Sequence, residues 1–324
     1  MQGKHGLLER DAQTIMALSK EMRKNHGRTE MKPSLAFPIP HTPEFDVNRI
    51  KNISEKYLDI SYASEKEHVL DLYLPEKKKE EYPLIIYIHE GAFIFGSKRD
   101  KRMESLFTAL QEGYAIASVD YRKADQVTWP APIYDIKAAV RFLRAHAGEY
   151  KLDKKRFTVW GMSAGAYLGV MTAVTNHMQW FEDSSMGNPH ESSEIQSVVD
   201  LCGACAGFHR LDDFIEENGF GIANHNEANS PESILMGQPL KDARELCNMA
   251  NPINYIREDI PPFFVLHCLK DPVVPVQQSR LLVEEIVKKA GADKVTAIFT
   301  ESEADHGKPE IGRASCRERV SSPV

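Results

Sequence analysis

The feature that most constrains this chain is the alternation of two hydrophobic patterns along most of its length. Short apolar runs such as 83–89 are typical of strands buried on both faces. Between them lie longer segments with apolar residues at helical spacing, such as the stripe from Ile133 to Ala147. Because strands that are separated by helices pair in parallel, we expect an α/β fold with helices on both faces of a mostly parallel sheet.

The same patterns assign the elements by residue range. We expect a sheet of about eight strands, with a helix over most of the intervals between the later ones. The predicted strands are 57–63, 68–74, 83–89, 114–121, 157–160, 197–201, 263–268 and 295–300, and the predicted helices are 101–112, the segment carrying Ile133 to Ala147, 164–176 and 276–290.

Composition excludes several classes of protein. The net charge of −7, from 40 Lys and Arg against 47 Asp and Glu, disfavours a nucleic-acid-binding surface. No apolar run is long enough to span a membrane, and the first residues do not resemble a secretory signal, so we expect a cytoplasmic protein. The 5 cysteines are too few and too scattered for a disulfide framework. A redox role for the CxxC sequence Cys202 to Cys205 remains the less favoured alternative.

One short motif carries the first chemical signal. The run Gly161-Met162-Ser163-Ala164-Gly165 follows a predicted strand and opens a predicted helix. Small flanking residues let the chain turn sharply enough to project the Ser163 hydroxyl from the sheet edge. The motif therefore predicts that Ser163 is a nucleophile, although an ordinary strand-to-helix turn could also have this sequence.

A serine nucleophile needs a base and an acid that orients this base. His306 lies on the loop after the last predicted strand, and Asp271 follows the strand before it. Their chain order, nucleophile then acid then base, is the order found when this motif serves a catalytic triad. We expect Ser163, Asp271 and His306 to form the triad, with Asp200 as the fallback acid.

The loop after strand 83–89 offers donors for an oxyanion. The backbone N–H groups of Gly91 and Ala92, together with that of Ala164 in the serine motif, are expected to converge on a substrate carbonyl oxygen. Phe93, Trp129 and Tyr167 are candidates for a substrate pocket, although aromatic residues near a sheet are more often core residues.

These segments together resemble a known family. His89 to Phe93, the serine motif and Asp271-Pro272-Val273-Val274-Pro275 are similar to α/β-hydrolase esterases with an HGGG-type oxyanion loop, and most similar to the bacterial feruloyl and acetyl-xylan esterase branch. The resemblance covers roughly residues 55–307. It implies the α/β-hydrolase fold and hydrolysis of short acyl or hydroxycinnamoyl esters, such as acetylated or feruloylated plant oligosaccharides. It also implies that the enzyme uses no cofactor and no metal.

The chain departs from the family pattern at Glu90, which stands where the family has glycine. If the backbone there needs an unusual conformation, a side chain would cost about 1–3 kcal/mol. We expect Glu90 to point away from the oxyanion, so that Glu90→Gly keeps or raises turnover.

Two other functions stay open. The first alternative is a serine peptidase or amidase on the same fold, including arylformamidase-like chemistry, and the second is a non-catalytic binding protein.

The expected partners follow from the composition and the family. The expected ligand is a small-molecule or oligosaccharide ester. Neither nucleic acid nor a membrane is an expected partner, and a homodimer is left open.

The chain is expected to contain one catalytic domain with terminal extensions. Residues 1–54 are predicted to hold an amphipathic helix (7–24) and a proline-rich linker, and 55–309 the α/β-hydrolase domain with a lid-like excursion over 177–260. Residues 311–320 read as one translated frame of a widely used sequencing adapter. We therefore expect 310–324 to be a non-native tail, which resequencing of the source DNA across codon 311 would test.

Overall fold

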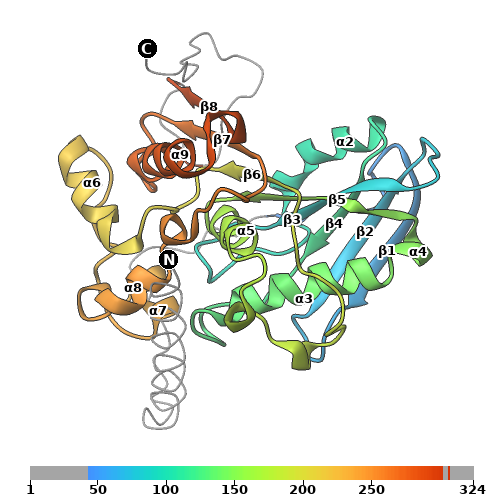
Figure 1. Cartoon of the computed structure of the whole chain (residues 1–324), viewed down its shortest axis with the longest axis horizontal. Coiled ribbons are helices and arrows are strands. Elements are labelled where there is room, and N and C mark those ends of the chain that lie inside the picture. The colour runs from blue at the N-terminus through green and yellow to red at the C-terminus, as the bar shows by residue number, and fades with distance from the viewer. Residues whose placement is uncertain (1–42, 302–305, 307–324) are drawn as a thin grey trace.

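The computed structural model describes residues 43–301 and His306, and its centre is an eight-stranded sheet (Figure 1). The strand order is β1-β2-β4-β3-β5-β6-β7-β8, in which β2 pairs antiparallel with β1 and β4 and all other neighbours are parallel. The strands are β1 Ile53–Ser61, β2 Val69–Pro75, β3 Tyr82–Ile88, β4 Ala115–Val119, β5 Leu152–Met162, β6 Ser197–Leu201, β7 Phe263–Cys268 and β8 Val295–Thr300.

Helices cover both faces of this sheet, and α2 and α3 lie on opposite sides of it (Figure 1). On one face Ile136 of α3 and Val170 of α5 join a buried cluster with Ile86 of β3, and on the other Leu110 of α2 joins Tyr87. The α-helices are α2 Thr108–Gln111, α3 Ala131–Ala145, α4 Ala147–Tyr150, α5 Ala164–Val174, α6 Leu211–Asn218, α7 Pro231–Met236, α8 Arg244–Met249 and α9 Gln277–Ala290. Short 3₁₀ helices are η1 Lys101–Phe107, η2 Gln179–Phe181, η3 Ser184–Met186, η4 Phe208–Arg210, η5 Leu240–Asp242, η6 Pro252–Tyr255 and η7 Ala292–Lys294.

The predicted α/β-hydrolase architecture is confirmed. Strands 197–201, 263–268 and 295–300 agree with the structure residue for residue. The largest difference is β5, which begins at Leu152 rather than at 157. Its first half carries the exposed polar residues Lys154 to Arg156, so it has no apolar pattern from which a strand could be predicted.

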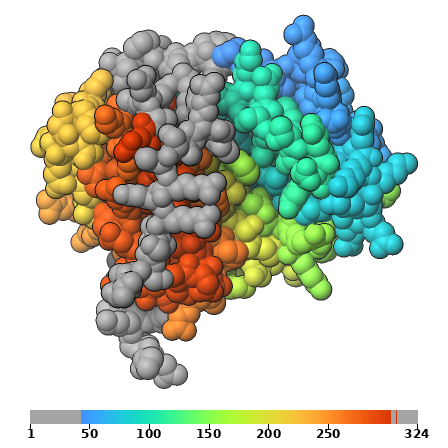
Figure 2. All heavy atoms as spheres, turned by 90° about the horizontal axis from the view of Figure 1, so that it is seen from above, coloured from blue at the N-terminus to red at the C-terminus, as the bar shows by residue number. Residues whose placement is uncertain are grey.

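The predicted excursion over 177–260 is divided by β6. After β6 the chain forms α6, α7 and α8, which gather on the side of the molecule away from β1 (Figure 1). In the space-filling view these yellow and orange segments and the blue to cyan segment that contains β1 and β2 form opposite flanks (Figure 2). Phe208 and Phe214 are buried within this part, so it is a packed extension of the core. A lid function for it stays a prediction.

Residues 43–54, which precede the predicted catalytic domain, pack against the rest of the protein. Phe45 is buried and its ring lies 5.1 Å from that of Phe107 in an edge-to-face contact. The predicted helix over 7–24 and the tail over 310–324 lie outside the described residues. Across residues 43–301 and His306, no helix combines the length and the apolar character that a membrane crossing needs.

Candidate active site

The chain turns sharply at Ser163, between the end of β5 and the start of α5. Ser163 has φ 53° and ψ −120°, a conformation rare for a residue with a side chain. A Cβ atom on Gly161 would lie 2.3 Å from the carbonyl carbon of Gly165, and one on Gly165 would lie 2.1 Å from the carbonyl oxygen of Ile88. The two glycines therefore let α5 start directly against the end of β3.

The structure brings the three predicted triad residues together. The Nε2 atom of His306 lies 2.8 Å from Oγ of Ser163, and its Nδ1 atom lies 2.8 Å from Oδ2 of Asp271. The Asp271 side chain is fully buried, while 15% of the His306 side chain is exposed. Serine, imidazole and carboxylate thus form one hydrogen-bonded chain that runs from the half-buried serine into the interior.

The carboxylate of Asp271 is held on its other side by backbone donors. Oδ1 accepts hydrogen bonds from the amides of Val273 and Val274, both at 2.9 Å. Burial alone would raise the pKa of Asp271, but hydrogen bonds with His267 and His306 hold this pKa well below its usual value. Asp271 therefore stays ionised next to His306.

Asp200, the fallback acid, has a different environment. It is buried, its Oδ1 accepts from the amide of Gly203 at 2.8 Å, and burial raises its pKa. The imidazole of His306 pairs with Asp271 instead, so the geometry favours Asp271 as the acid.

A second histidine, His267 of β7, supports the acid and was missed in the sequence analysis. Its ring is buried, with Nδ1 2.7 Å from the Ser279 hydroxyl and Nε2 2.8 Å from the Val274 carbonyl oxygen. Nε2 also lies 3.5 Å from Oδ2 of Asp271. The only sequence signal was its position four residues before the acid, at the end of a buried strand.

The loop after β3 has the backbone conformation of a tight turn. Gly91, Ala92 and Phe93 have φ of 119°, 49° and 64°, and the Gly91 carbonyl accepts from the amides of Ile94 (2.9 Å) and Phe95 (3.0 Å). This loop starts where Gly165 of the serine motif touches the backbone of Ile88 and His89. The Ala164 amide is also available as a donor, because the first N–H groups of a helix have no partner within the helix.

His89 anchors this loop from inside the protein. Its ring stacks on Tyr121 with centroids 4.3 Å apart, and Nδ1 lies 2.7 Å from the carbonyl oxygen of Glu90. Burial lowers the pKa of His89 to about 4, so the ring is neutral near pH 7 and its Nδ1–H can donate to that carbonyl.

Glu90 differs in part from the expectation. Its buried carboxylate pairs with the guanidinium of Arg102 in η1, as expected for a side chain that does not enter the oxyanion position. Glu90 is not among the residues with positive φ, so the unusual conformation that would make a side chain costly there is not seen. Within this loop, the residues with side chains that have positive φ are Ala92 and Phe93, one and two positions after Gly91.

The three aromatic candidates for the substrate pocket lie in the core. Phe93, Trp129 and Tyr167 are 2%, 3% and 0% exposed. The Trp129 indole donates to the Tyr167 hydroxyl at 3.0 Å, and the rings of Phe93 and Tyr167 pack edge to face. This burial argues against direct contact with substrate, and we interpret the three rings as support for the loop after β3.

The CxxC pair does not have the environment of a redox motif. Cys202 and Cys205 are free and buried. Burial, reinforced by nearby carboxylates, raises the pKa of both thiols well above the usual value, whereas reactive redox cysteines have a lowered pKa.

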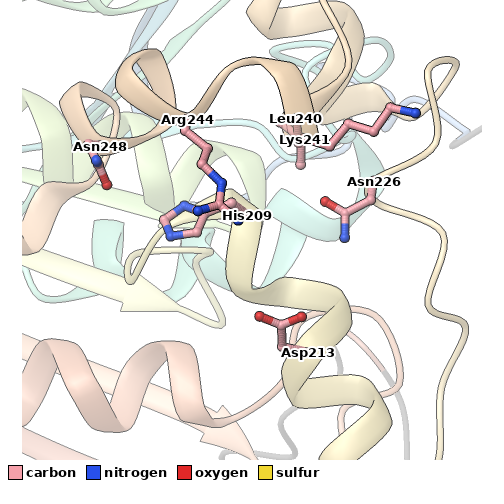
Figure 3. A pocket seen from close by; sticks show the side chains of 7 residues that line it. All are labelled: His209, Asp213, Asn226, Leu240, Lys241, Arg244 and Asn248. Atoms are coloured by element: carbon pink, nitrogen blue, oxygen red, sulfur yellow. The ribbon is translucent and has the colours of Figure 1, made fainter.

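A depression of about 400 Å³ lies beside η4, between α6 on one side and η5 with α8 on the other (Figure 3). Phe208, the first residue of η4, is buried next to this depression in sequence, and its ring centroid lies 5.8 Å from that of Phe93 in the loop after β3. Of the described residues that line the depression, none belongs to the triad. Its lining, most of which can donate or accept hydrogen bonds, consists of His209, Asp213, Asn226, Leu240, Lys241, Arg244 and Asn248.

With this geometry established, similarity to known proteins identifies the family. The BD-FAE family matches residues 70–286, which is more than half of the chain. The chain belongs to the BD-FAE family.

Known relatives of this BD-FAE protein include esterases. Esterase LipQ of Mycobacterium tuberculosis is 28% identical over 266 residues, which are 80% of this chain and 58% of LipQ. The chain thus spans little more than half the length of that relative. A truncated carbohydrate esterase from gut microbiota has a similar structure, with a TM-score of 0.69 and 29% identity over 79% of this chain and 90% of that one. A bifunctional GH43-CE protein of Bacteroides eggerthii has a TM-score of 0.68 and 28% identity over 78% of this chain and 35% of that one.

The contact between the serine turn and β3 predicts the effect of one substitution. Gly165→Ala places a methyl group against the backbone of Ile88, so we expect a loss of about 3 kcal/mol of stability or a displaced Ser163, and in either case loss of any activity that depends on Ser163. Gly148→Ala in α4 is the matched control, because nothing lies within 4 Å of its added methyl group. Thermal melting and ester hydrolysis of both variants check this, and a fully active Gly165→Ala protein would contradict it.

The pairing of Glu90 with Arg102 predicts unequal effects of its two partners. Glu90→Gly should retain turnover and lose about 1 kcal/mol of stability, because the Arg102 side chain, 40% exposed, can still be hydrated. Arg102→Met should lower the stability more, by about 3 kcal/mol, because it leaves the Glu90 carboxylate, which is 4% exposed, without a positively charged partner. Urea unfolding and initial rates measure both effects; a Glu90→Gly protein that is stable but inactive would show that Glu90 acts in catalysis.

Proposed function

We propose that this protein is a carboxylic ester hydrolase that works through an acyl-enzyme on Ser163. The observation that carries the proposal is the unbroken hydrogen-bonded chain from Ser163 through His306 to Asp271, with both distances 2.8 Å. The named esterases among its relatives support the same reaction class.

In the first half-reaction, Nε2 of His306 accepts the proton of Ser163 as Oγ attacks the ester carbonyl. The imidazolium that forms faces the buried Asp271 carboxylate, which stabilises it and keeps the ring oriented. His306 then donates the proton to the leaving alcohol. Water then enters and gives a proton to His306 as its oxygen attacks the acyl carbon. The bond to Oγ of Ser163 breaks, His306 returns the proton to Oγ, and the acid leaves.

The tetrahedral intermediates carry a negative oxygen that needs donors already in place. We assign this role to the backbone N–H groups of Gly91, Ala92 and Ala164, as in an HGGG-type loop. The anchoring of the loop by His89 supports this assignment, because donors that need not reorganise stabilise the transition state most.

For the substrate we propose short acyl or hydroxycinnamoyl esters on plant oligosaccharides. The structural relative named as a carbohydrate esterase supports a sugar-containing substrate. The depression beside η4 also supports it, because the amide and charged side chains in its lining suit the hydroxyl groups of a sugar (Figure 3).

A substrate panel tests this proposal. Aryl esters of rising acyl length, methyl ferulate, acetylated xylooligosaccharides and an aminoacyl anilide are compared on wild type, Ser163→Ala and the control Ser184→Ala, which removes an exposed serine hydroxyl. We expect ester hydrolysis that Ser184→Ala retains and that Ser163→Ala lowers by about 10⁴-fold or more. Arg244→Ala should raise KM for the oligosaccharide ester but not for the aryl acetate.

Each other outcome has a definite meaning. Faster turnover of the anilide than of every ester would favour the peptidase or amidase alternative. Turnover that survives Ser163→Ala would refute the proposed nucleophile. No turnover of any substrate by wild type would favour a binding protein that has lost catalysis.

A further inference from the structure

A third side chain of a different chemical kind lies beside the acid and the base. Cys202 directly follows β6 and is 2% exposed. One possible ligand atom from each of Cys202, Asp271 and His306 lies within 4.8 Å of the other two. We propose that these three residues form a binding site for Zn²⁺, and that the bound ion inhibits the enzyme.

The donor set fits a zinc ion. A thiolate sulfur, an imidazole nitrogen and a carboxylate oxygen are the three ligand types that zinc takes in proteins, and thiolate disfavours hard ions such as Mg²⁺. In a tetrahedral site with bonds of about 2.0–2.3 Å, ligand atoms lie about 3.3–3.8 Å apart. The observed atoms all lie within 4.8 Å of one another, so a pair at that limit needs to approach by about 1.0–1.5 Å.

The backbone fixes the position of Cys202. Its N–H donates to the Leu266 carbonyl at 3.0 Å, and the carbonyl of the preceding Leu201 accepts from the Ser163 amide at 2.8 Å. Cys202 also has φ 49°, so the chain bends at this residue as it leaves the sheet. The thiol is therefore tied to the same turn that holds the nucleophile.

Zinc at this site stops catalysis whichever nitrogen of His306 it uses. Binding at Nδ1 replaces the hydrogen bond with Asp271 that orients the ring. Binding at Nε2 removes the lone pair that accepts the proton of Ser163. The ion forms one bond each to sulfur, nitrogen and oxygen, and the thiol proton of Cys202 passes to the buffer. If Nδ1 binds, the ring proton moves to Nε2, which then cannot accept the proton of Ser163. The ion is an inhibitor here and takes no part in ester hydrolysis.

The inhibition rests on the proposed function, because ester hydrolysis is the reaction that zinc would block. The test uses the full chain with an aryl acetate, titrated with ZnCl₂ and then with EDTA. We expect inhibition that EDTA reverses and that MgCl₂ does not produce. Cys202→Ala should keep activity within a few-fold and raise the inhibitory zinc concentration at least about 100-fold, since losing a ligand exceeds the 10- to 100-fold effect of losing an outer partner.

Cys247→Ala is the matched control, because it removes another buried free thiol that is not part of the group. It should remain as sensitive to zinc as wild type. Equal inhibition of wild type and Cys202→Ala would overturn the proposal, as would an unaffected wild type.

A second readout does not depend on activity. Co²⁺ added to the protein should give a near-ultraviolet thiolate-to-cobalt absorption band in wild type and Cys247→Ala and none in Cys202→Ala. A cobalt band in a wild-type protein without esterase activity would refute the proposed function but support the metal site. An active enzyme without the band would refute the site alone.

Discussion

The hydrogen-bonded chain from Asp271 through His306 to Ser163 depends on one constraint, the parallel arrangement of the strands from β3 to β8. Parallel strands carry the loops that follow them to the same edge of the sheet. Ser163 follows β5, Asp271 follows β7 and His306 lies beyond β8, so residues distant in sequence meet at this edge. Gly165 adds a local requirement, because only a residue without a side chain lets α5 approach β3 this closely.

Two sets of groups surround the triad. One set holds the acid, and the other holds the loop that we propose to supply hydrogen-bond donors to the oxyanion. His267 and the amides of Val273 and Val274 hold the Asp271 carboxylate, while His89 holds the loop after β3 through the Glu90 carbonyl. Both histidine rings are buried, and neither belongs to the triad. The proposed triad is therefore made of side chains, while the groups that hold its acid and the proposed oxyanion donors are largely backbone groups.

Much of this could be predicted from sequence because the signals are local. Hydrophobic periodicity located all eight strands, and the motif at 161–165 with its strand and helix pointed to Ser163. The polar start of β5, the pairing of Glu90 with Arg102 and the closeness of Cys202 to the triad could not be predicted in this way. Each depends on which distant segments become neighbours, and the alternation of apolar residues does not encode that. The aromatic residues Trp129 and Tyr167 were ambiguous for the same reason, since a pocket wall and a core have the same composition.

The most direct measurement of the central claim is covalent labelling of the protein in the absence of substrate. The protein is treated with a fluorophosphonate, which phosphonylates an activated serine, and then digested and mapped by mass spectrometry. The account predicts one adduct, on the peptide that carries Ser163, and its loss in His306→Gln, in which the base is removed. An adduct on another serine, or labelling of Ser163 that is unchanged in His306→Gln, would contradict it.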